Sequence, residues 1–165
     1  MFRLLTRDDI PGLHRLEAEL YLPSLHESDE AFIRLMELFP EGAIGCFDDE
    51  GLCGYAFGVP LTAGRTLELR TPLERIPDEP DTFYLHDVAI AERMRGRGVG
   101  RALAHRLLDL ARARGLTRSE LVSVQGSAPF WEKFGFRAAA VPGLEAKLSS
   151  YGPDAVLMVQ QVPGA

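Results

Sequence analysis

The sequence is poor in cysteine and has no long apolar run. Two cysteines, Cys46 and Cys53, are too few for a disulfide framework, so we expect two buried structural thiols in a reducing compartment. No apolar stretch approaches the length of a membrane span, and the N-terminus MFRLLTRDDI lacks a signal-peptide core. We therefore expect a cytoplasmic protein with no membrane contact.

Histidines are also few, and a general excess of positive charge is absent. The four histidines show no metal-ligand spacing with one another or with the cysteines, which predicts no metal. The net charge of −6 argues against a general nucleic-acid binder, and we expect no nucleic-acid partner.

What the sequence does contain is the composition of an ordinary globular protein. Its 165 residues are 46% hydrophobic and 25% charged, which predicts one domain over residues 1–165 with a core of its own. We find no internal repeat and no low-complexity tract.

Positive charge is concentrated in one window, residues 91–118. Eight arginines against Glu92 and Asp109 give this window a charge of +6, which leaves −12 for the rest of the chain. A basic patch on an acidic protein suits an anionic small ligand. For most of these arginines a solvated helix face is the better interpretation, and only Arg95, Arg97 and Arg101 have a stronger claim to a ligand.

Hydrophobic periodicity predicts an α/β protein with a mixed sheet covered by helices. The spacing Thr6-Arg7-Asp8-Asp9 is that of a capping box before a first helix. The strand–helix–strand unit at 83–124 requires parallel neighbouring strands. Residues 61–81 read as a long loop, which in a compact domain is often functional. The expected strands are 2–5, 43–47, 52–60, 83–90, 121–124, 136–140 and 155–162. Four helices are expected: one after Thr6, one after Ser28, one over 99–114 and one over 128–134.

The most informative stretch is the glycine-rich turn RGRGVG at 95–100, between a strand and an amphipathic helix. Free N–H groups at a helix N-terminus form an anion site, and glycines let the backbone approach phosphate oxygens. The turn is not a Walker loop, because the lysine-Ser/Thr pair is absent, and it lacks the early βαβ context of a dinucleotide fingerprint. We favour phosphate binding over a purely structural turn.

Two motifs together resemble one family. The turn at 95–100 looks like the Gln/Arg-x-x-Gly-x-Gly/Ala signature of the GNAT acetyltransferase superfamily. The segment SAPFWEKFGF at 127–136 is similar to that family's C-terminal motif, which usually ends in Phe/Leu-Tyr-Glu-Lys-Leu-Gly-Phe. The resemblance implies a GNAT acyl-CoA N-acyltransferase fold with about six to seven strands flanked by about four helices.

The resemblance further implies acetyl-CoA as the donor and direct transfer, in a ternary complex, to a primary amine of a small molecule or peptide. Main-chain groups of Val88 and Ile90 would bind the pantetheine arm, and the Val88 amide would polarise the thioester carbonyl. Homodimers are common in the family. The residues expected to bind the cofactor are Val88, Ile90, Arg95, Gly96, Arg97, Gly98, Val99, Gly100, Arg101 and Trp131.

His86 is the candidate general base. It lies two residues before Val88, so strict alternation would project both side chains from one strand face. Some polyamine-acetylating members of the family carry glutamate at this position, and a histidine there could accept the amine proton. A satisfied interior histidine is an equally good interpretation. Asp87 is expected on the other face, in a structural hydrogen bond.

Trp131 is the clearest departure from the family pattern. The aligned residue is commonly a tyrosine that protonates the departing thiolate, and an indole cannot do so. Another acid could serve, the thiolate could leave unaided, or the protein could bind CoA without transfer. Tyr151 is a candidate substitute if its loop folds over the site.

Two other functions therefore stay open beside the transferase. The first is a catalytically weak acyl-CoA-binding regulator, motivated by Trp131. The second is a nucleotide-binding module, supported only by the glycine turn. The segments at 20–40 and 61–81, which would shape the acceptor pocket, carry no recognised motif.

Overall fold

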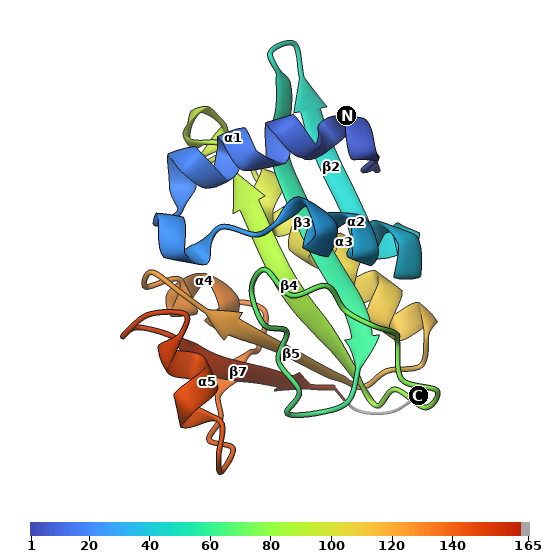
Figure 1. Ribbon diagram of the computed structural model, residues 1–165, viewed down its shortest axis with the longest axis vertical. Coiled ribbons are helices and arrows are strands. Elements are labelled where there is room, and N and C mark those ends of the chain that lie inside the picture. Colours follow the sequence, from blue (N-terminus) through green and yellow to red (C-terminus); the bar gives the residue numbers. More distant parts are fainter. Residues whose placement is uncertain (163–165) are drawn as a thin grey trace.

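A seven-stranded mixed sheet forms the centre of the computed structural model, which describes residues 1–162 (Figure 1). Its strand order is β1-β2-β3-β4-β5-β7-β6, and the pair β4–β5 is parallel whereas the other neighbours are antiparallel. This confirms the predicted fold class and the parallel crossover. The strands are β1 Phe2–Leu4, β2 Ala43–Asp48, β3 Gly51–Leu61, β4 Thr82–Ile90, β5 Arg118–Ser123, β6 Arg137–Ala138 and β7 Val156–Gln161.

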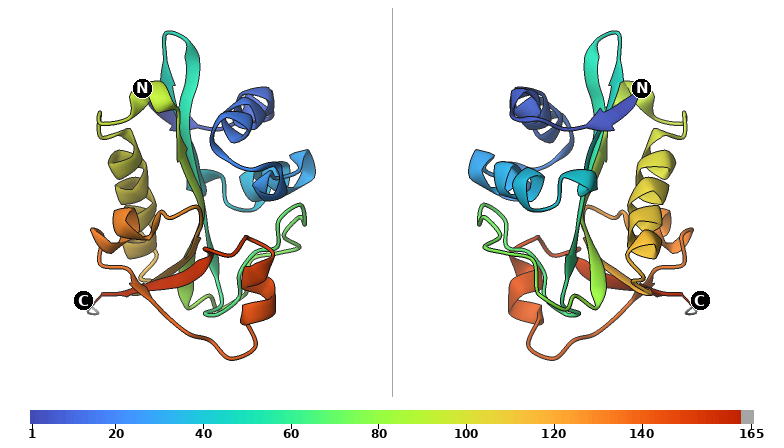
Figure 2. Two further views of the ribbon diagram at one scale, coloured as in Figure 1. Left: turned by 90° about the vertical axis from the view of Figure 1, so that its left-hand side faces the viewer. Right: turned by 90° about the vertical axis from the view of Figure 1, so that its right-hand side faces the viewer.

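Helices cover both faces of the sheet (Figure 2). One face carries α3 and α4, and the other carries α1, α2, α5 and the loop at 62–81. Within residues 1–162, no helix combines the length and the apolar character that crossing a membrane requires. The helices are α1 Ile10–Leu20, α2 Asp29–Leu38, α3 Val99–Ala113, α4 Ala128–Glu132 and α5 Glu145–Ser149.

The predicted start signals of the first two helices are confirmed. At the capping box, the Thr6 backbone N–H donates to Asp9 Oδ2 at 2.8 Å, at the start of the 3-10 turn Arg7–Asp9 that leads directly into α1. At the start of α2, the Ser28 hydroxyl accepts a hydrogen bond from the Ala31 amide at 3.2 Å. These bonds satisfy amides that have no partner inside a helix, so both helices begin at defined residues.

The apolar stripe of α3 packs on the centre of the sheet, as its periodicity predicts. Leu103 and Leu107 are fully buried against β3 and β4. Gly58 of β3 permits this contact, because a Cβ at that position would lie 3.1 Å from Leu107 Cδ2 and 2.5 Å from the Phe83 ring. The close packing of helix and sheet positions the glycine-rich turn, which immediately precedes α3.

The two cysteines are free and buried, as expected. A bulge in the β2–β3 hairpin pairs Cys46 with Gly54, and the Cys53 thiol donates to the Cys46 carbonyl at 3.3 Å. Burial raises the pKa of the Cys53 thiol to about 11. The thiol is therefore protonated at neutral pH and contributes to packing.

The C-terminal part differs most from the expected elements. Strand β5 begins at Arg118 instead of 121, and β6 is only two residues long. Helix α5 was not predicted, because it spans five residues, buries none of them and so shows no apolar periodicity. It changes the path of the chain before β7.

Candidate active site

A cleft of about 440 Å³ opens where β4 and β5 part. The parallel ladder between these strands covers only Phe83–Leu85 of β4 and Ser119–Leu121 of β5. Beyond it, residues from both faces of the sheet line the cleft. We call its two halves the α3 side, walled by Val88, Ile90, Arg95, Gly100, Phe130 and Trp131, and the α1 side, walled by Tyr21, Leu25, Glu27, Leu69, Tyr84, His86, Asp87 and Tyr151.

His86 lies at a β-bulge, and this corrects its predicted orientation. The register with β3 passes from Phe57 opposite Asp87 to Gly58 opposite Leu85, which leaves His86 as the extra residue. Such a bulge breaks the strict alternation of side chains. His86 and Asp87 consequently both point to the α1 side, so the expectation that His86 shares a face with Val88 was wrong.

His86 forms a buried pair with Glu27, which lies between α1 and α2. His86 Nε2 is 2.8 Å from Glu27 Oε2, and the two side chains are only 4% and 3% exposed. Burial lowers the pKa of His86, but the hydrogen bond to Glu27 and the nearby carboxylates outweigh it and raise the pKa above 6.5. The other ring nitrogen, Nδ1, is buried and has no hydrogen-bond partner within the described residues.

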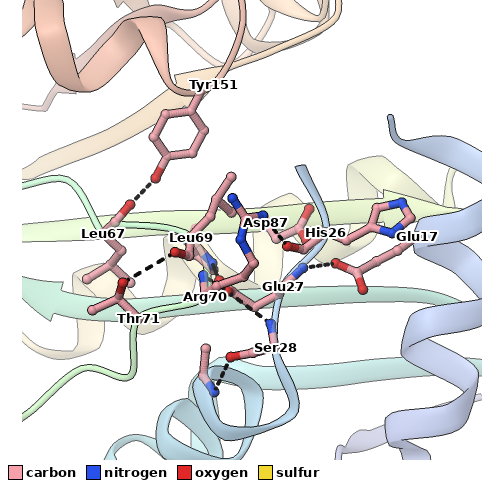
Figure 3. Close-up of polar contacts among 12 residues, drawn as sticks. Glu17, His26, Glu27, Ser28, Leu67, Leu69, Arg70, Thr71, Asp87 and Tyr151 are labelled. Atoms are coloured by element: carbon pink, nitrogen blue, oxygen red, sulfur yellow. Dashed lines mark hydrogen bonds and ion pairs between the residues drawn. The ribbon is translucent and has the colours of Figure 1, made fainter. Parts of the chain in front are cut away.

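Glu27 is fixed by the backbone around it (Figure 3). Its own amide donates to Glu17 Oε2 at 2.7 Å, and its Oε1 accepts hydrogen bonds from the amides of Ser28 and Arg70. Arg70 adopts φ = 58°, a left-handed conformation that is unusual outside glycine. The loop at 62–81 is thus tied to the segment that carries Glu27.

Asp87 makes the structural hydrogen bonds that were expected of it. The hydroxyls of Tyr21 and Tyr55 donate to its two carboxylate oxygens at 2.8 and 2.9 Å. Burial raises the pKa of Asp87, while His86 and the two hydroxyls lower it in part. In residues 1–162, no group of three or more His, Cys, Asp or Glu side chains is arranged to hold a metal ion.

Strand β4 presents free main-chain groups along the α3 side. Consecutive residues in a strand direct their amides to opposite edges, and the amide of Ala91 bonds to the Cys53 carbonyl of β3. The amides of Val88 and Ile90 therefore face the edge that β5 leaves open. Their side chains lie on the α3 face, and a Cβ added at Gly100 would lie 3.4 Å from Ile90 Cδ1.

The glycine-rich turn leads directly into α3 and is open to solvent. Gly96 and Gly98 have φ values of 76° and 79°, and a Cβ on either would meet no atom within 4 Å. Arg95 and Gly100 line the cleft, whereas Arg97 and Arg101 are exposed beside it. Val99 is buried in the first turn of α3. The amides of this first turn have no intrahelical carbonyl to which they can donate.

The eight arginines of the basic window divide into two groups. Residues 1–162 provide no ion-pair or ring partner for Arg95, Arg97 and Arg101, which surround the glycine turn. The other five are held by protein groups: Arg93 by Asp48, Arg112 by Asp109, Arg114 by Glu41, Arg118 by Glu120, and Arg106 over the ring of Phe2. The five arginines expected to form a solvated helix face are thus held by protein groups, and the ligand role of the other three stays a prediction.

Trp131 and Tyr151 lie on opposite sides of the cleft. Trp131 is 7% exposed, walls the α3 side and packs edge-on against Phe130 at a ring distance of 4.9 Å. Tyr151 follows α5, and its hydroxyl donates to the carbonyl of Leu67 in the loop (Figure 3). Burial raises the pKa of Tyr151. The chain therefore does fold Tyr151 back to the cleft, on the same side as His86.

The sequence also matches a known family model over residues 10–136, described as "Acetyltransferase (GNAT) family". This chain belongs to the GNAT acetyltransferase family. It is 40% identical over 55 residues to glucosamine 6-phosphate N-acetyltransferase of Trypanosoma brucei brucei, covering 33% of this chain and 37% of that protein. It is 28% identical over 142 residues to serotonin N-acetyltransferase of Mesocricetus auratus, covering 83% and 67%.

Solved structures agree with this membership at the level of the fold. The GphF GNAT-like decarboxylase in complex with isobutyryl-CoA superposes with a TM-score of 0.76 at 16% identity, over 99% of this chain and 100% of the other. That protein binds an acyl-CoA. At this identity the likeness shows only the fold.

Glu27 is the site residue that sequence reasoning missed. It is 59 residues from His86 in the chain and lies in a segment without a recognisable motif. Its burial is the only unusual feature, since a glutamate is rarely buried unless it is paired. No signal in a single sequence marks such a residue, because its partner comes from a distant strand.

Proposed function

We propose that this protein is an N-acetyltransferase that transfers the acetyl group of acetyl-CoA to a primary amine of a small molecule or peptide, by direct attack in a ternary complex. The observation that carries the proposal is the cleft between β4 and β5, whose walls include both Arg95 of the glycine turn and the His86–Glu27 pair. The two relatives are named for an amino sugar phosphate and an arylalkylamine, which supports an amine acceptor.

The α3 side fits the donor. The open space at Gly96 and Gly98 leaves room for a pyrophosphate against the amides that start α3, and Arg95, Arg97 and Arg101 add unpaired positive charge. The free amides of Val88 and Ile90 suit the pantetheine arm. When bound, acetyl-CoA supplies an activated thioester to the adjoining α1 side.

His86 would act as the general base. An alkylammonium has a pKa of about 10, so it must lose a proton before it attacks a carbonyl carbon. With Nε2–H donating to Glu27, the lone pair on Nδ1 is left to accept that proton. The amine then forms a C–N bond as the C–S bond breaks, and the Val88 amide donates to the carbonyl oxygen that gains charge.

Tyr151 is the proposed proton donor to the departing thiolate. Burial raises the pKa of its hydroxyl, which therefore stays protonated at neutral pH. Its present hydrogen bond to the Leu67 carbonyl must be exchanged for one to sulfur. Trp131, at the position of the usual tyrosine, walls the cleft and donates no phenolic proton.

The substitution at Trp131 also favours a second candidate, an acyl-CoA-binding regulator with weak or no transfer activity. Both candidates predict acetyl-CoA binding, and only the transferase predicts turnover. Steady-state release of CoA in the presence of primary amines distinguishes the two.

Thermal unfolding with acetyl-CoA, ATP and NAD tests the donor site. At a hundred times its Kd, a ligand stabilises the folded state by about 2.7 kcal/mol, which raises Tm by about 5–11 °C in a protein of this size. We expect this shift with acetyl-CoA alone. Arg97→Gln should reduce it, whereas Arg112→Gln, whose arginine is paired with Asp109, should leave it unchanged. No shift at millimolar acetyl-CoA contradicts the proposal.

A further inference from the structure

The α1 side of the cleft is negatively charged. Glu27 is buried and Asp87 is half-buried in its wall, and Glu17 lies directly behind Glu27. Of the described residues that line the cleft, Arg95 is the only arginine, it belongs to the α3 side, and no lysine is among them. The nearby Arg70 is committed elsewhere, since its guanidinium donates to the carbonyls of Ser24 and His26.

The mouth of the α1 side continues this charge. A second, more open cavity of about 570 Å³ shares Leu20, Tyr21 and Gln125 with the cleft, so the two are contiguous. It adds the carboxylates of Glu19 and Asp154, and no basic residue is among its described lining residues. An approaching molecule therefore meets negative charge from the mouth to the His86–Glu27 pair.

The remaining walls of the α1 side are apolar. Leu25 and Leu69 contribute aliphatic surface, and the rings of three tyrosines complete it. Two of the three hydroxyls are already used, because Tyr21 donates to Asp87 and Tyr151 donates to the Leu67 carbonyl. Few polar groups are left to bond the hydroxyls of a sugar.

We propose that the acceptor is a primary ammonium on an apolar aliphatic or aromatic body, without a carboxylate or phosphate group. This inference rests on the proposed acetyltransferase function and deepens it. The ammonium is attracted by the carboxylates, and its body covers the leucines and tyrosine rings. An anionic group on the acceptor would be buried near Glu27 and Asp87, and no arginine or lysine is among the described residues of the α1 side to pair with it.

Matched amines test separately whether the acceptor must lack an anionic group and whether its body must be apolar. Hexylamine and 6-aminohexanoate share one chain and differ in a carboxylate, and we expect kcat/KM for hexylamine to be higher by at least about tenfold. Glucosamine carries the ammonium on a polar body and should also fall below hexylamine, with glucosamine 6-phosphate lower still. Equal or faster acetylation of 6-aminohexanoate or glucosamine 6-phosphate overturns the proposal.

A variant in the loop sharpens the test. Leu69 lines the cleft and is half-buried, so Leu69→Lys places a cation in the α1 side. The preference for hexylamine over 6-aminohexanoate should then fall by at least about tenfold. Thr71→Lys adds the same charge at an exposed position of this loop that does not line the cleft, and should leave the preference unchanged. If Leu69→Lys keeps the wild-type preference for hexylamine over 6-aminohexanoate, the α1 side is not the acceptor site.

The thermal shift with acetyl-CoA, measured in parallel on each variant, separates the two proposals. If acetyl-CoA stabilises the protein but no amine is acetylated, the transferase itself fails, and the acceptor class fails with it. If amines are acetylated and the anionic members of the pairs are preferred, the transferase stands and only the acceptor class is wrong.

Discussion

The two sides of the cleft differ in how they are built. The α3 side takes its charge from Arg95, Arg97 and Arg101, which are neighbours in the chain, are exposed to solvent and have no ion-pair or ring partner within residues 1–162. The α1 side takes its charge from the buried Glu27 and the half-buried Asp87, and groups from distant segments hold both side chains. A local turn is enough to bind a phosphate, whereas a buried proton acceptor needs a folded environment that sets its orientation and pKa.

The largest expected effect is at His86. His86→Gln keeps a polar side chain of similar length but removes the proposed base, and kcat should fall by about 100- to 10,000-fold. The shift in Tm with acetyl-CoA should persist, because the donor is held on the other side of the cleft. His105→Gln, at an exposed position on α3, is the matched control. A kcat within threefold of wild type contradicts the base assignment.

On the α3 side, Gly98→Val should weaken CoA binding, by a smaller factor than His86→Gln lowers kcat. A β-branched side chain in the open space at this turn should block the pyrophosphate and raise the Kd for CoA by at least about tenfold, which is about 1.4 kcal/mol. Gly115→Val is the control, because Gly115 has a similar φ of 72° and open surroundings but lies at the far end of α3. Both variants carry the same backbone strain. Equal loss of CoA affinity in both would show that strain, not blocking, is responsible.

The smallest effect is a displacement of the pH profile, and it tests how the α1 side sets the pKa of its base. His86 must be neutral to accept a proton. Burial lowers its pKa, but the hydrogen bond to Glu27 and the charges of Glu27, Asp87 and Glu17 raise the pKa above 6.5. In wild type, kcat should therefore fall as the pH drops through a value above 6.5. Glu27→Gln removes the main raising contribution, so this limb should move to lower pH. If the acidic limb of the kcat profile has the same midpoint in Glu27→Gln as in wild type, the His86–Glu27 pair does not control it.

Much of the fold follows from local patterns. The seven strands, the long loop at 62–81 and the first four helices were predicted, because capping residues and apolar periodicity act within a few residues of each other. Helix α5 was missed, since it buries no side chain. The prediction that Tyr151 returns to the cleft was conditional on the path of this segment, and no local pattern sets that path.

The orientation of His86 shows the limit of local reasoning within a single strand. Alternation placed its side chain with Val88, and the bulge opposite Phe57 and Gly58 placed it with Asp87 instead. The bulge lies next to the point where β4 loses its pairing with β5, and alternation along β4 does not reveal either feature.

The sequence by itself indicated the family, the seven strands, the first four helices and the glycine turn with its three arginines, because each depends on residues that are close together in the chain. Only the tertiary structure decided that Glu27 contacts His86, that Tyr151 lies in the cleft wall and that the α1 side is acidic and apolar. Those features arise from segments many residues apart, and their contacts form only when the sheet, the loop and the helices pack together.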